Sequence, residues 1–282
     1  MYTIREKRVL SSNVKLLVID APHVAHKALA GQFIMLRIDG NGERIPLTIA
    51  GYDRESGAVT IIFQEVGKTT KQLGLLNVGD SLADFVGPLG TASHFEGVKR
   101  AAVIGGGLGT AIAYPQAKAL KEHGAHVDMI VGFRNKELIM LEEEFAAASD
   151  RLFITTDDGS NGKKGFVSDV LRELLEAGER YDLVVAIGPV MMMKVVSDMT
   201  RPYGIHTVVS MNSIMVDGTG MCGCCRVTVG GETKFACVDG PDFDGHQVDF
   251  EEALRRGAMY RKEEAESLER HVCRLTGEVR NG

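Results

Sequence analysis

Residues 101–111 read AAVIGGGLGTA, a short apolar run that leads into a glycine-rich turn and then into a segment with helical periodicity. A strand, a glycine loop and a helix in this order form the context in which a dinucleotide-binding loop is found. Small residues let the backbone approach a pyrophosphate at the N-terminus of a helix. The alternative is a glycine-rich turn that serves packing alone. The residues assigned to the loop are Gly105, Gly106, Gly107, Leu108, Gly109 and Thr110.

The sequence around this loop alternates between apolar strands and helical segments. Strands are expected at residues 101–104, 127–132, 152–155, 183–187 and 206–210, and helices at 111–123, 138–148, 166–177 and 190–199. This order predicts an α/β domain with a parallel sheet and right-handed crossovers over residues 98–210. Ligands of such sheets lie at the carboxyl ends of the strands. Asp157 and Gly188 follow two of these ends and are candidates for the nucleotide site, with plain turns as the alternative.

The residues before this domain, 1–97, read as short strands separated by turn signals. An antiparallel β-barrel is the expected fold, because closure removes exposed sheet edges. Its most informative segment reads Arg44-Ile-Pro46-Leu47-Thr48. An arginine four positions before a threonine lies on the same strand face, where the pair can bind a phosphate and a flavin ring. A solvated arginine is the alternative.

A second segment of the barrel region resembles a nucleotide loop but lacks the spacing of a P-loop. It contains Gly67, Lys68, Thr69 and Thr70, which begin a short helix. The amides and hydroxyls of such a helix start can hold an anion. An ordinary helix cap formed by Thr69 or Thr70 is the alternative.

The region from residue 211 to 248 carries four of the five cysteines of the chain. Plant-type two-iron clusters use C-x4-C-x2-C and a distant fourth cysteine. Cys222 and Cys225 have the x2 spacing, Cys237 follows in the next expected strand, and Asp217 stands where the first cysteine would be. A carboxylate can ligate iron, although it is a harder donor than thiolate. The motif therefore predicts an iron–sulfur site, in which Cys224 is not a ligand. A zinc ribbon or a set of buried thiols is the alternative.

Composition narrows the class of protein further. The chain has 282 residues, 44% of them hydrophobic and 25% charged, so it is expected to bury a substantial core. A net charge of -6 disfavours a nucleic-acid partner. The N-terminus lacks the continuous apolar run of a signal peptide, and no membrane span is apparent. A cytoplasmic protein is expected, and in that compartment clustered cysteines indicate metal or redox chemistry.

Taken in order, R-x-P-L-T, G-G-G-L-G-T-A and the cysteine loop resemble the ferredoxin–NADP reductase superfamily. Within it, the chain resembles the electron-transfer subunits of dihydroorotate dehydrogenase B. It is more similar still to the small subunits of NADH-dependent reduced ferredoxin:NADP oxidoreductases, also described as sulfide dehydrogenases, because Asp217 replaces a cysteine. The resemblance implies an FAD site lined by Arg44, Pro46, Leu47 and Thr48, with the FAD phosphates held by Gly67, Lys68, Thr69 and Thr70. It also implies that residues 105–110, with Asp157 and Gly188, frame NAD(H). Finally, it implies that a two-iron, two-sulfur (2Fe-2S) cluster is bound by Asp217, Cys222, Cys225 and Cys237.

The same resemblance implies an electron relay between NAD(H), FAD and the cluster, with no catalytic dyad or triad. It implies a heterodimer with a larger flavin and iron–sulfur subunit, which would couple NADH and reduced ferredoxin to NADP by electron bifurcation. The charged tail, residues 249–282, is expected to be helical and to contact that partner. The alternatives are the electron-transfer subunit of dihydroorotate dehydrogenase B, a sulfide dehydrogenase subunit, and a non-catalytic redox sensor. Asp157 and Asp158 would repel a ribose 2′-phosphate, which favours NAD as the nucleotide. Arg134 and Lys136 can accept that phosphate, which keeps NADP as an alternative.

Overall fold

The structure, a computed structural model, describes residues 1–276, with side-chain surroundings for residues 1–270. Seven antiparallel strands come first: β1 (Tyr2–Ser11), β2 (Val14–Asp20), β3 (Phe33–Arg37), β4 (Ile45–Asp53), β5 (Ala58–Gln64), β6 (Ser81–Leu82) and β7 (Asp84–Leu89). Their order in the sheet is β6-β1-β2-β5-β4-β3-β7. Strands β6 and β7 are separated only by Ala83 and pair with the two opposite edges, so one segment nearly closes the predicted barrel. Two short helices, α1 (Pro22–Ala25) and α2 (Lys68–Leu75), complete this part.

Alternation along the strands builds the barrel interior. The side chains of Leu17, Ile19, Ile61 and Phe63 are fully buried and belong to one apolar cluster. They occupy every second position of β2 and β5, as expected for strands with one face toward a core.

The α/β domain follows. Five of its strands are parallel and lie in the order β10-β9-β8-β11-β12. They are β8 (Arg100–Gly106), β9 (His126–Phe133), β10 (Arg151–Thr156), β11 (Leu183–Ile187) and β12 (His206–Ser210). The connecting helices are α3 (Gly109–Glu122), α4 (Glu142–Ala147), α5 (Val167–Glu176) and α6 (Val190–Thr200), with short 3₁₀ turns at Lys136–Leu138 and Arg201–Tyr203. The predicted order of strands and helices is confirmed.

Successive residues of the central strand β8 serve two different cores. Ala101 and Val103 pack with residues of α3 and α4 on one face of the sheet. Ala102 and Ile104 pack with residues of α5 and α6 on the other face. Helices therefore cover both faces, which explains why the strand is apolar throughout rather than alternating.

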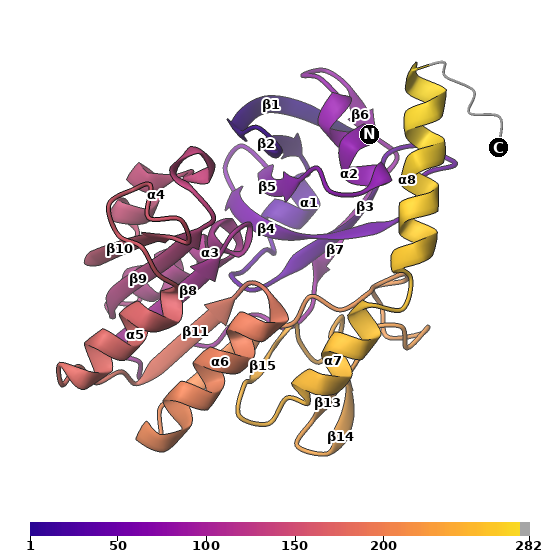
Figure 1. Cartoon of the computed structure of the whole chain (residues 1–282). Helices are drawn as coiled ribbons and strands as arrows, with labels where there is room; N and C mark the ends of the chain where they lie inside the picture. Colours follow the sequence, from indigo (N-terminus) through magenta and orange to yellow (C-terminus); the bar gives the residue numbers. More distant parts are fainter. Residues whose placement is uncertain (277–282) are drawn as a thin grey trace.

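The cysteine-rich region forms a hairpin of β13 (Arg226–Val229) and β14 (Glu232–Phe235), whose strands are joined by Gly230 and Gly231. Beyond it, β15 (Asp242–Asp244) pairs antiparallel with β12 at the edge of the second sheet. A purely parallel sheet was expected, so this edge strand is a difference from the sequence prediction. Two helices end the described chain: α7 (Phe250–Gly257), which packs against α6, and α8 (Arg261–Thr276), which reaches α2 of the barrel (Figure 1). The expected helical tail is thus present up to Thr276, and its last residues, 277–282, lie outside the described residues.

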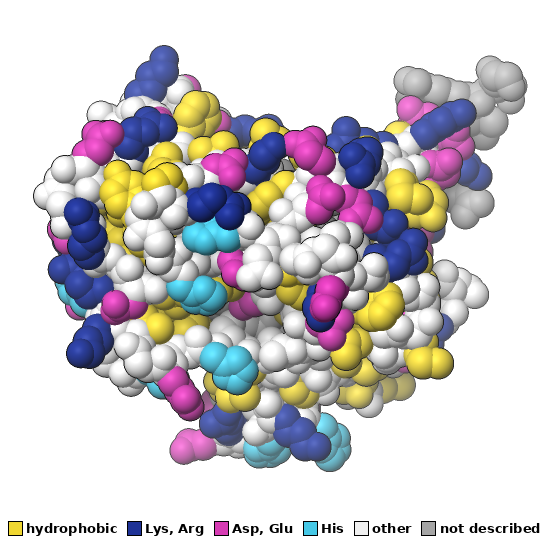
Figure 2. Space-filling model, turned by 90° about the horizontal axis from the view of Figure 1, so that it is seen from below, with side chains coloured by type: hydrophobic (Ala, Val, Ile, Leu, Met, Phe, Trp, Pro, Cys, Tyr) yellow, Lys and Arg dark blue, Asp and Glu magenta, His cyan; other side chains and the backbone are white. Residues whose placement is uncertain are grey.

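No helix among the described residues is both long and apolar enough to cross a membrane. On the face shown in Figure 2, basic side chains lie among acidic ones rather than gathering into one basic area.

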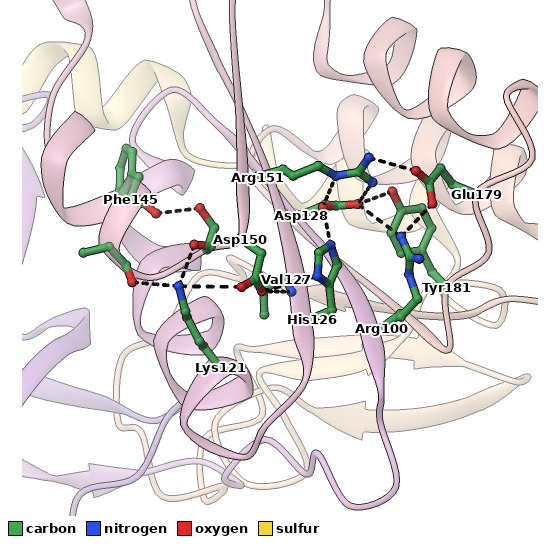
Figure 3. A network of polar contacts seen from close by, with 12 residues as sticks. Arg100, Lys121, His126, Val127, Asp128, Phe145, Asp150, Arg151, Glu179 and Tyr181 are labelled. Carbon is green, nitrogen blue, oxygen red and sulfur yellow. Dashed lines mark hydrogen bonds and ion pairs between the residues drawn. The ribbon is translucent and has the colours of Figure 1, made fainter.

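A charged network holds the amino ends of the parallel strands together (Figure 3). The carboxylate of Asp128 on β9 is fully buried and accepts hydrogen bonds from Arg151 Nε at 2.7 Å and from the Tyr181 hydroxyl at 2.7 Å. Burial pushes the pKa of Asp128 up, but the hydrogen bonds from Arg151 and Tyr181 and the charge of Arg151 outweigh it and lower the pKa. Glu179 completes the network by accepting from both Arg100 and Arg151.

We predict that Asp128→Asn lowers the free energy of unfolding by about 2 kcal/mol at pH 7. Breaking a fully buried ion pair costs about 3–5 kcal/mol, and the partial exposure of Arg151 reduces that figure. Because the pKa of Asp128 is lowered by folding, its contribution is present above the ordinary Asp pKa of about 4 and is lost as the pH falls through the lowered value.

Urea unfolding at neutral and acidic pH measures both effects. Glu173→Gln, which removes an exposed partner of Lys163, is the matched control and should cost less than about 0.5 kcal/mol. A wild type and an Asp128→Asn variant of equal stability at pH 7 would contradict the prediction.

Candidate functional site

A cleft of about 1150 Å³ lies between the barrel and the carboxyl ends of the parallel strands. It is lined from one side by β4 and β5 and from the other by the glycine loop and the ends of β9, β10 and β11. Ten of the predicted cofactor residues line it: Pro46, Leu47, Thr48, Thr70, Gly106, Gly107, Leu108, Gly109, Asp157 and Gly188. Two segments that the sequence assigned to different cofactors thus share one cavity, which is of a size that binds large organic ligands.

The glycine loop divides into residues that face the cleft and residues that pack. Gly107 has a φ of +56°, and a Cβ built on it would meet no atom within 4 Å. A Cβ on Gly109 would lie 2.2 Å from the carbonyl oxygen of Ile187, so this glycine allows the turns after β8 and β11 to touch. Gly105 and Thr110 do not line the cleft, because they pack against each other where β8 passes into α3. Backbone N–H groups at the start of α3 remain suited to an anion.

The start of α2 is capped by its own side chains. The Thr70 hydroxyl accepts hydrogen bonds from the backbone N–H groups of Val66 and Gly67, at 3.1 and 3.0 Å. The Thr69 hydroxyl donates to the Glu43 carboxylate. Gly67 is therefore the N-cap residue, Thr70 bonds back to its N–H from the third helical position, and Thr69 does not cap the helix. A phosphate at this helix would be held by backbone N–H groups and Lys68, because the two hydroxyls already have partners.

Arg44 lies apart from the cleft. Its guanidinium contacts the Asp84 carboxylate at 3.3 Å, half of its side chain is exposed, and Arg37 shares the same carboxylate at 2.7 Å. Strand β4 begins only at Ile45, so the alternation that was to place Arg44 beside Thr48 does not extend to it. Arg44 instead lies near the cysteine loop, where the pKa of Asp217 is lowered mainly by hydrogen bonds from Thr219 and only slightly by the charge of Arg44.

The predicted cluster ligands lie on one loop and the hairpin after it. Cys225 and Cys237 are buried side by side, and the Cys237 N–H lies 3.4 Å from the Cys225 sulfur. Burial, and then the neighbouring Cys225, raise the pKa of Cys237 to about 12. Cys222 is exposed, and the backbone N–H of Cys224 lowers its pKa. Iron binding must therefore displace protons from these thiols, above all from Cys237.

Asp217 and Cys224, the two candidates for the fourth ligand, have different surroundings. The Asp217 carboxylate accepts from the Thr219 N–H at 3.0 Å and from the Thr219 hydroxyl, and hydrogen bonds from Thr219 lower its pKa. It also lies close enough to Cys222 for its charge to act on that thiol. Cys224 lines a small cavity of about 50 Å³ with Arg256 and Tyr260 on the α7 side, and its carbonyl accepts from Arg256 at 2.9 Å.

This donor set fits an iron–sulfur cluster, because three thiols and one carboxylate are available within one small element. In the described part of the chain, no three His, Cys, Asp or Glu side chains are grouped closely enough to hold a single metal ion. The glycine turns fit the close wrapping that a cluster needs: Gly220, with a φ of +84°, brings the loop against Val238.

Comparisons with known proteins agree with this assembly. Residues 1–94 match the model of the oxidoreductase FAD-binding domain, and residues 212–249 match the iron–sulfur cluster binding domain of dihydroorotate dehydrogenase B. A homologue of the electron-transfer subunit of dihydroorotate dehydrogenase B (NAD(+)) from Thermotoga maritima is 47% identical over 254 residues, which cover 90% of this chain and 89% of that protein. The chain belongs to the family of dihydroorotate dehydrogenase B electron-transfer subunits.

Two further proteins are also similar to this chain. An uncharacterized protein from the adh 3′ region of Clostridium beijerinckii is 54% identical over 275 residues, covering 95% of this chain and 93% of the relative. A solved structure of an NADH-dependent reduced ferredoxin-NADP oxidoreductase, described in connection with flavin-based electron bifurcation, superimposes with a TM-score of 0.91. That match is 44% identical and covers 96% of this chain and 98% of the other. The predicted superfamily, its barrel-plus-α/β fold, and an oxidoreductase that uses FAD and an iron–sulfur cluster are confirmed.

The sequence did not identify several residues that line the cleft. Phe166, directly before α5, is largely exposed there, and Met192 and Met215 line it as well. Ser210 at the end of β12 also faces the cleft. The position of Ser210 and Phe166 at the carboxyl edge of the sheet was the available signal, since that edge is where ligands bind.

Proposed function

We propose that this chain exchanges electrons between NAD(H), FAD and a 2Fe-2S cluster as the small subunit of a two-subunit oxidoreductase. The observation that carries the proposal is the single cleft, in which Pro46, Leu47 and Thr48 of the flavin-type barrel face the loop around Gly107. Bound there, FAD would supply both two-electron exchange with a nicotinamide and one-electron exchange with a cluster. The NADH dependence of the structurally similar oxidoreductase supports NAD(H) as the donor or acceptor.

The residues of the chain would bind and orient rather than react. Thr48 and Leu47 would position the flavin ring, and the first N–H groups of α2 would hold its phosphates. The loop from Gly106 to Gly109 would hold the nucleotide pyrophosphate at the start of α3. Asp157 at the rim would repel a ribose 2′-phosphate, which favours NAD over NADP.

The finer proposal is that the complex is an electron-bifurcating NADH-dependent reduced ferredoxin:NADP oxidoreductase. It is supported by the 0.91 TM-score match and by Asp217 at the first ligand position. A larger flavin and iron–sulfur subunit would then carry the ferredoxin and NADP sites. The second candidate, an electron-transfer subunit of dihydroorotate dehydrogenase B, is supported by the match of residues 212–249 to the cluster domain of that enzyme.

Anaerobic titration of the purified chain tests the relay. Stoichiometric NADH should bleach the flavin absorbance and produce the electron paramagnetic resonance signal of a reduced two-iron cluster, and NADPH should do so far more weakly. Co-expression with candidate large subunits, followed by assay of ferredoxin-dependent NADP reduction and of dihydroorotate oxidation, separates the two finer candidates. A flavin that NADH cannot reduce would contradict the relay itself.

Helix α8 is the proposed contact with the larger subunit. It extends beside α2 of the barrel (Figure 1). A chain that ends at Tyr260 should keep NADH-dependent dye reduction but lose stable association with its partner, measured by co-elution of the co-expressed subunits. A full-length chain that carries Glu176→Lys, a charge change at an exposed residue of α5, is the control for solubility. Unchanged co-elution of the shortened chain would exclude this contact.

A further inference from the structure

A buried carboxyl group lies where the three parts of the molecule meet, behind the cleft. Asp242, the first residue of β15, accepts hydrogen bonds on Oδ2 from the Ser93 hydroxyl at 2.6 Å and from Gln116 Nε2 at 2.9 Å. Ser93 lies in the segment that leaves the barrel, and Gln116 lies on α3 of the nucleotide domain. The backbone segment before Asp242 also joins these parts, since the carbonyl of Gly240 accepts from the Thr91 N–H and Pro241 lines the cleft.

The carboxyl group is not balanced by a cation. Its neighbours are neutral on every side: Ser93 from the barrel exit, Gln116 from α3 and Ser210 from β12. Its Oδ1 atom and the Oε1 atom of Gln116 are both buried without a hydrogen-bond partner. A buried carboxyl oxygen without a donor fits a carboxyl group that holds a proton. Burial accordingly raises the pKa of Asp242, and the hydrogen bonds from Ser93 and Gln116 offset this only in part.

Ser210 connects this group to the cleft. It is the direct cross-strand neighbour of Asp242 in the β12–β15 pair, and it lines the cleft. Ser93, which donates to Asp242, is half-buried and lies in the chain between the exposed residues Thr91 and His94. Asp242 thus neighbours one hydroxyl group that lines the cofactor cleft and one that lies beside solvent-exposed residues.

The cleft otherwise offers few groups that can take up a proton. Among the described residues that line it, the titratable side chains are Arg134 and Asp157, both exposed at the rim of the nucleotide half. Neither side chain lies in the barrel half of the cleft, so a group behind its wall can serve proton exchange there.

We propose that Ser210, Asp242 and Ser93 form a proton pathway between the cleft and solvent. The inference rests on the proposed function, in which oxidation of one NADH to NAD⁺ leaves two electrons and one proton. The electrons leave singly through the cluster, so the proton must leave by another route. A proton that enters at the Ser210 hydroxyl displaces the Ser210 proton onto Asp242, and Asp242 releases its own proton through Ser93. For NAD⁺ reduction the same three transfers run in reverse.

Stopped-flow mixing of the full-length, cofactor-loaded chain with NADH and excess ferricyanide tests the pathway. Flavin absorbance reports electron transfer, and a pH-indicator dye reports proton release. In Asp242→Asn and in Ser210→Ala, proton release and steady-state turnover should slow on the order of 10²-fold, the usual contribution of one proton-transfer group. NADH affinity and FAD content should not change. Asp242→Glu should restore part of the rate, and Asp244→Asn, on the same strand, is the matched control.

A second measurement does not depend on turnover. Infrared spectra of the chain should contain the carbonyl band of a protonated carboxyl group at neutral pH, absent from Asp242→Asn and present in Asp244→Asn. If NADH cannot reduce the wild-type flavin, the proposed function fails. If wild-type reduction is normal but both variants release protons at the wild-type rate, the pathway is wrong. If Asp242→Asn does not fold, Ser210→Ala and the infrared band of the wild type decide the question.

Discussion

Gly107→Val should lower kcat/KM for NADH by roughly 10²-fold while FAD and the cluster stay bound, because a displacement of about 1 Å at a reacting centre has effects of this order. The site is open: no atom lies within 4 Å of a Cβ built on Gly107, so the valine would extend into the cleft rather than into the protein. The side chain would then occupy the space that the nucleotide backbone needs. Steady-state NADH oxidation with a dye acceptor measures the loss, and absorbance spectra check both cofactors.

The backbone of Gly107 requires a control for strain. Its φ of +56° costs a residue with a side chain about 1–2 kcal/mol. Gly124, directly after α3, has a φ of +86° and equally open surroundings, but it lies at the other end of the helix from the cleft. Gly124→Val should therefore lose similar stability and keep normal NADH kinetics. Gly109→Val is unsuitable, because its side chain would collide with the backbone at Ile187. Equal KM values for NADH in the Gly107 and Gly124 variants would show that Gly107 does not contribute to the NADH-binding site.

The sequence predicted the cleft well wherever a periodic pattern fixed the backbone. Runs such as residues 183–187 are apolar at every position, which fits strands covered on both faces. Once those strands are parallel, their carboxyl ends must share one edge, and Asp157 and Gly188 meet there for that reason.

The sequence could not predict features that depend on distant partners. The packing role of Gly109 is set by Ile187, almost eighty residues later in the chain. Strand β15 has only three residues, two of them aspartates, and so has no strand signature. The surroundings of Arg44 likewise follow from the point at which β4 begins and from Asp84, which no local pattern indicates.

The largest loss of cofactor is expected at the buried pair of cysteines. Cys225→Ser and Cys237→Ser should each abolish the visible and paramagnetic signals of the cluster, because each removes one of the two buried, adjacent thiols of the proposed ligand set. Cys224→Ser should leave spectrum and potential nearly unchanged, since Cys224 lies on the α7 side of the loop beside Arg256. Iron and sulfide content per chain, with FAD content as the internal control, measures all three variants.

The fourth ligand needs two substitutions that separate ligation from capping, because Asp217 also holds the loop through Thr219. Asparagine keeps an oxygen that can accept the Thr219 N–H but is a weak iron ligand, whereas cysteine ligates iron and cannot replace that acceptor well. If Asp217 ligates the cluster, Asp217→Asn should make it labile and Asp217→Cys should retain it with a shifted reduction potential, since ligand identity sets the potential. If Asp217 only caps the loop, the order reverses, with Asp217→Asn stable and Asp217→Cys impaired. We expect the first result, because Asp217 stands at the position of the first cysteine in the C-x4-C-x2-C spacing of plant-type clusters. If the cluster is stable in Asp217→Asn but lost in Cys224→Ser, Cys224 is the fourth ligand.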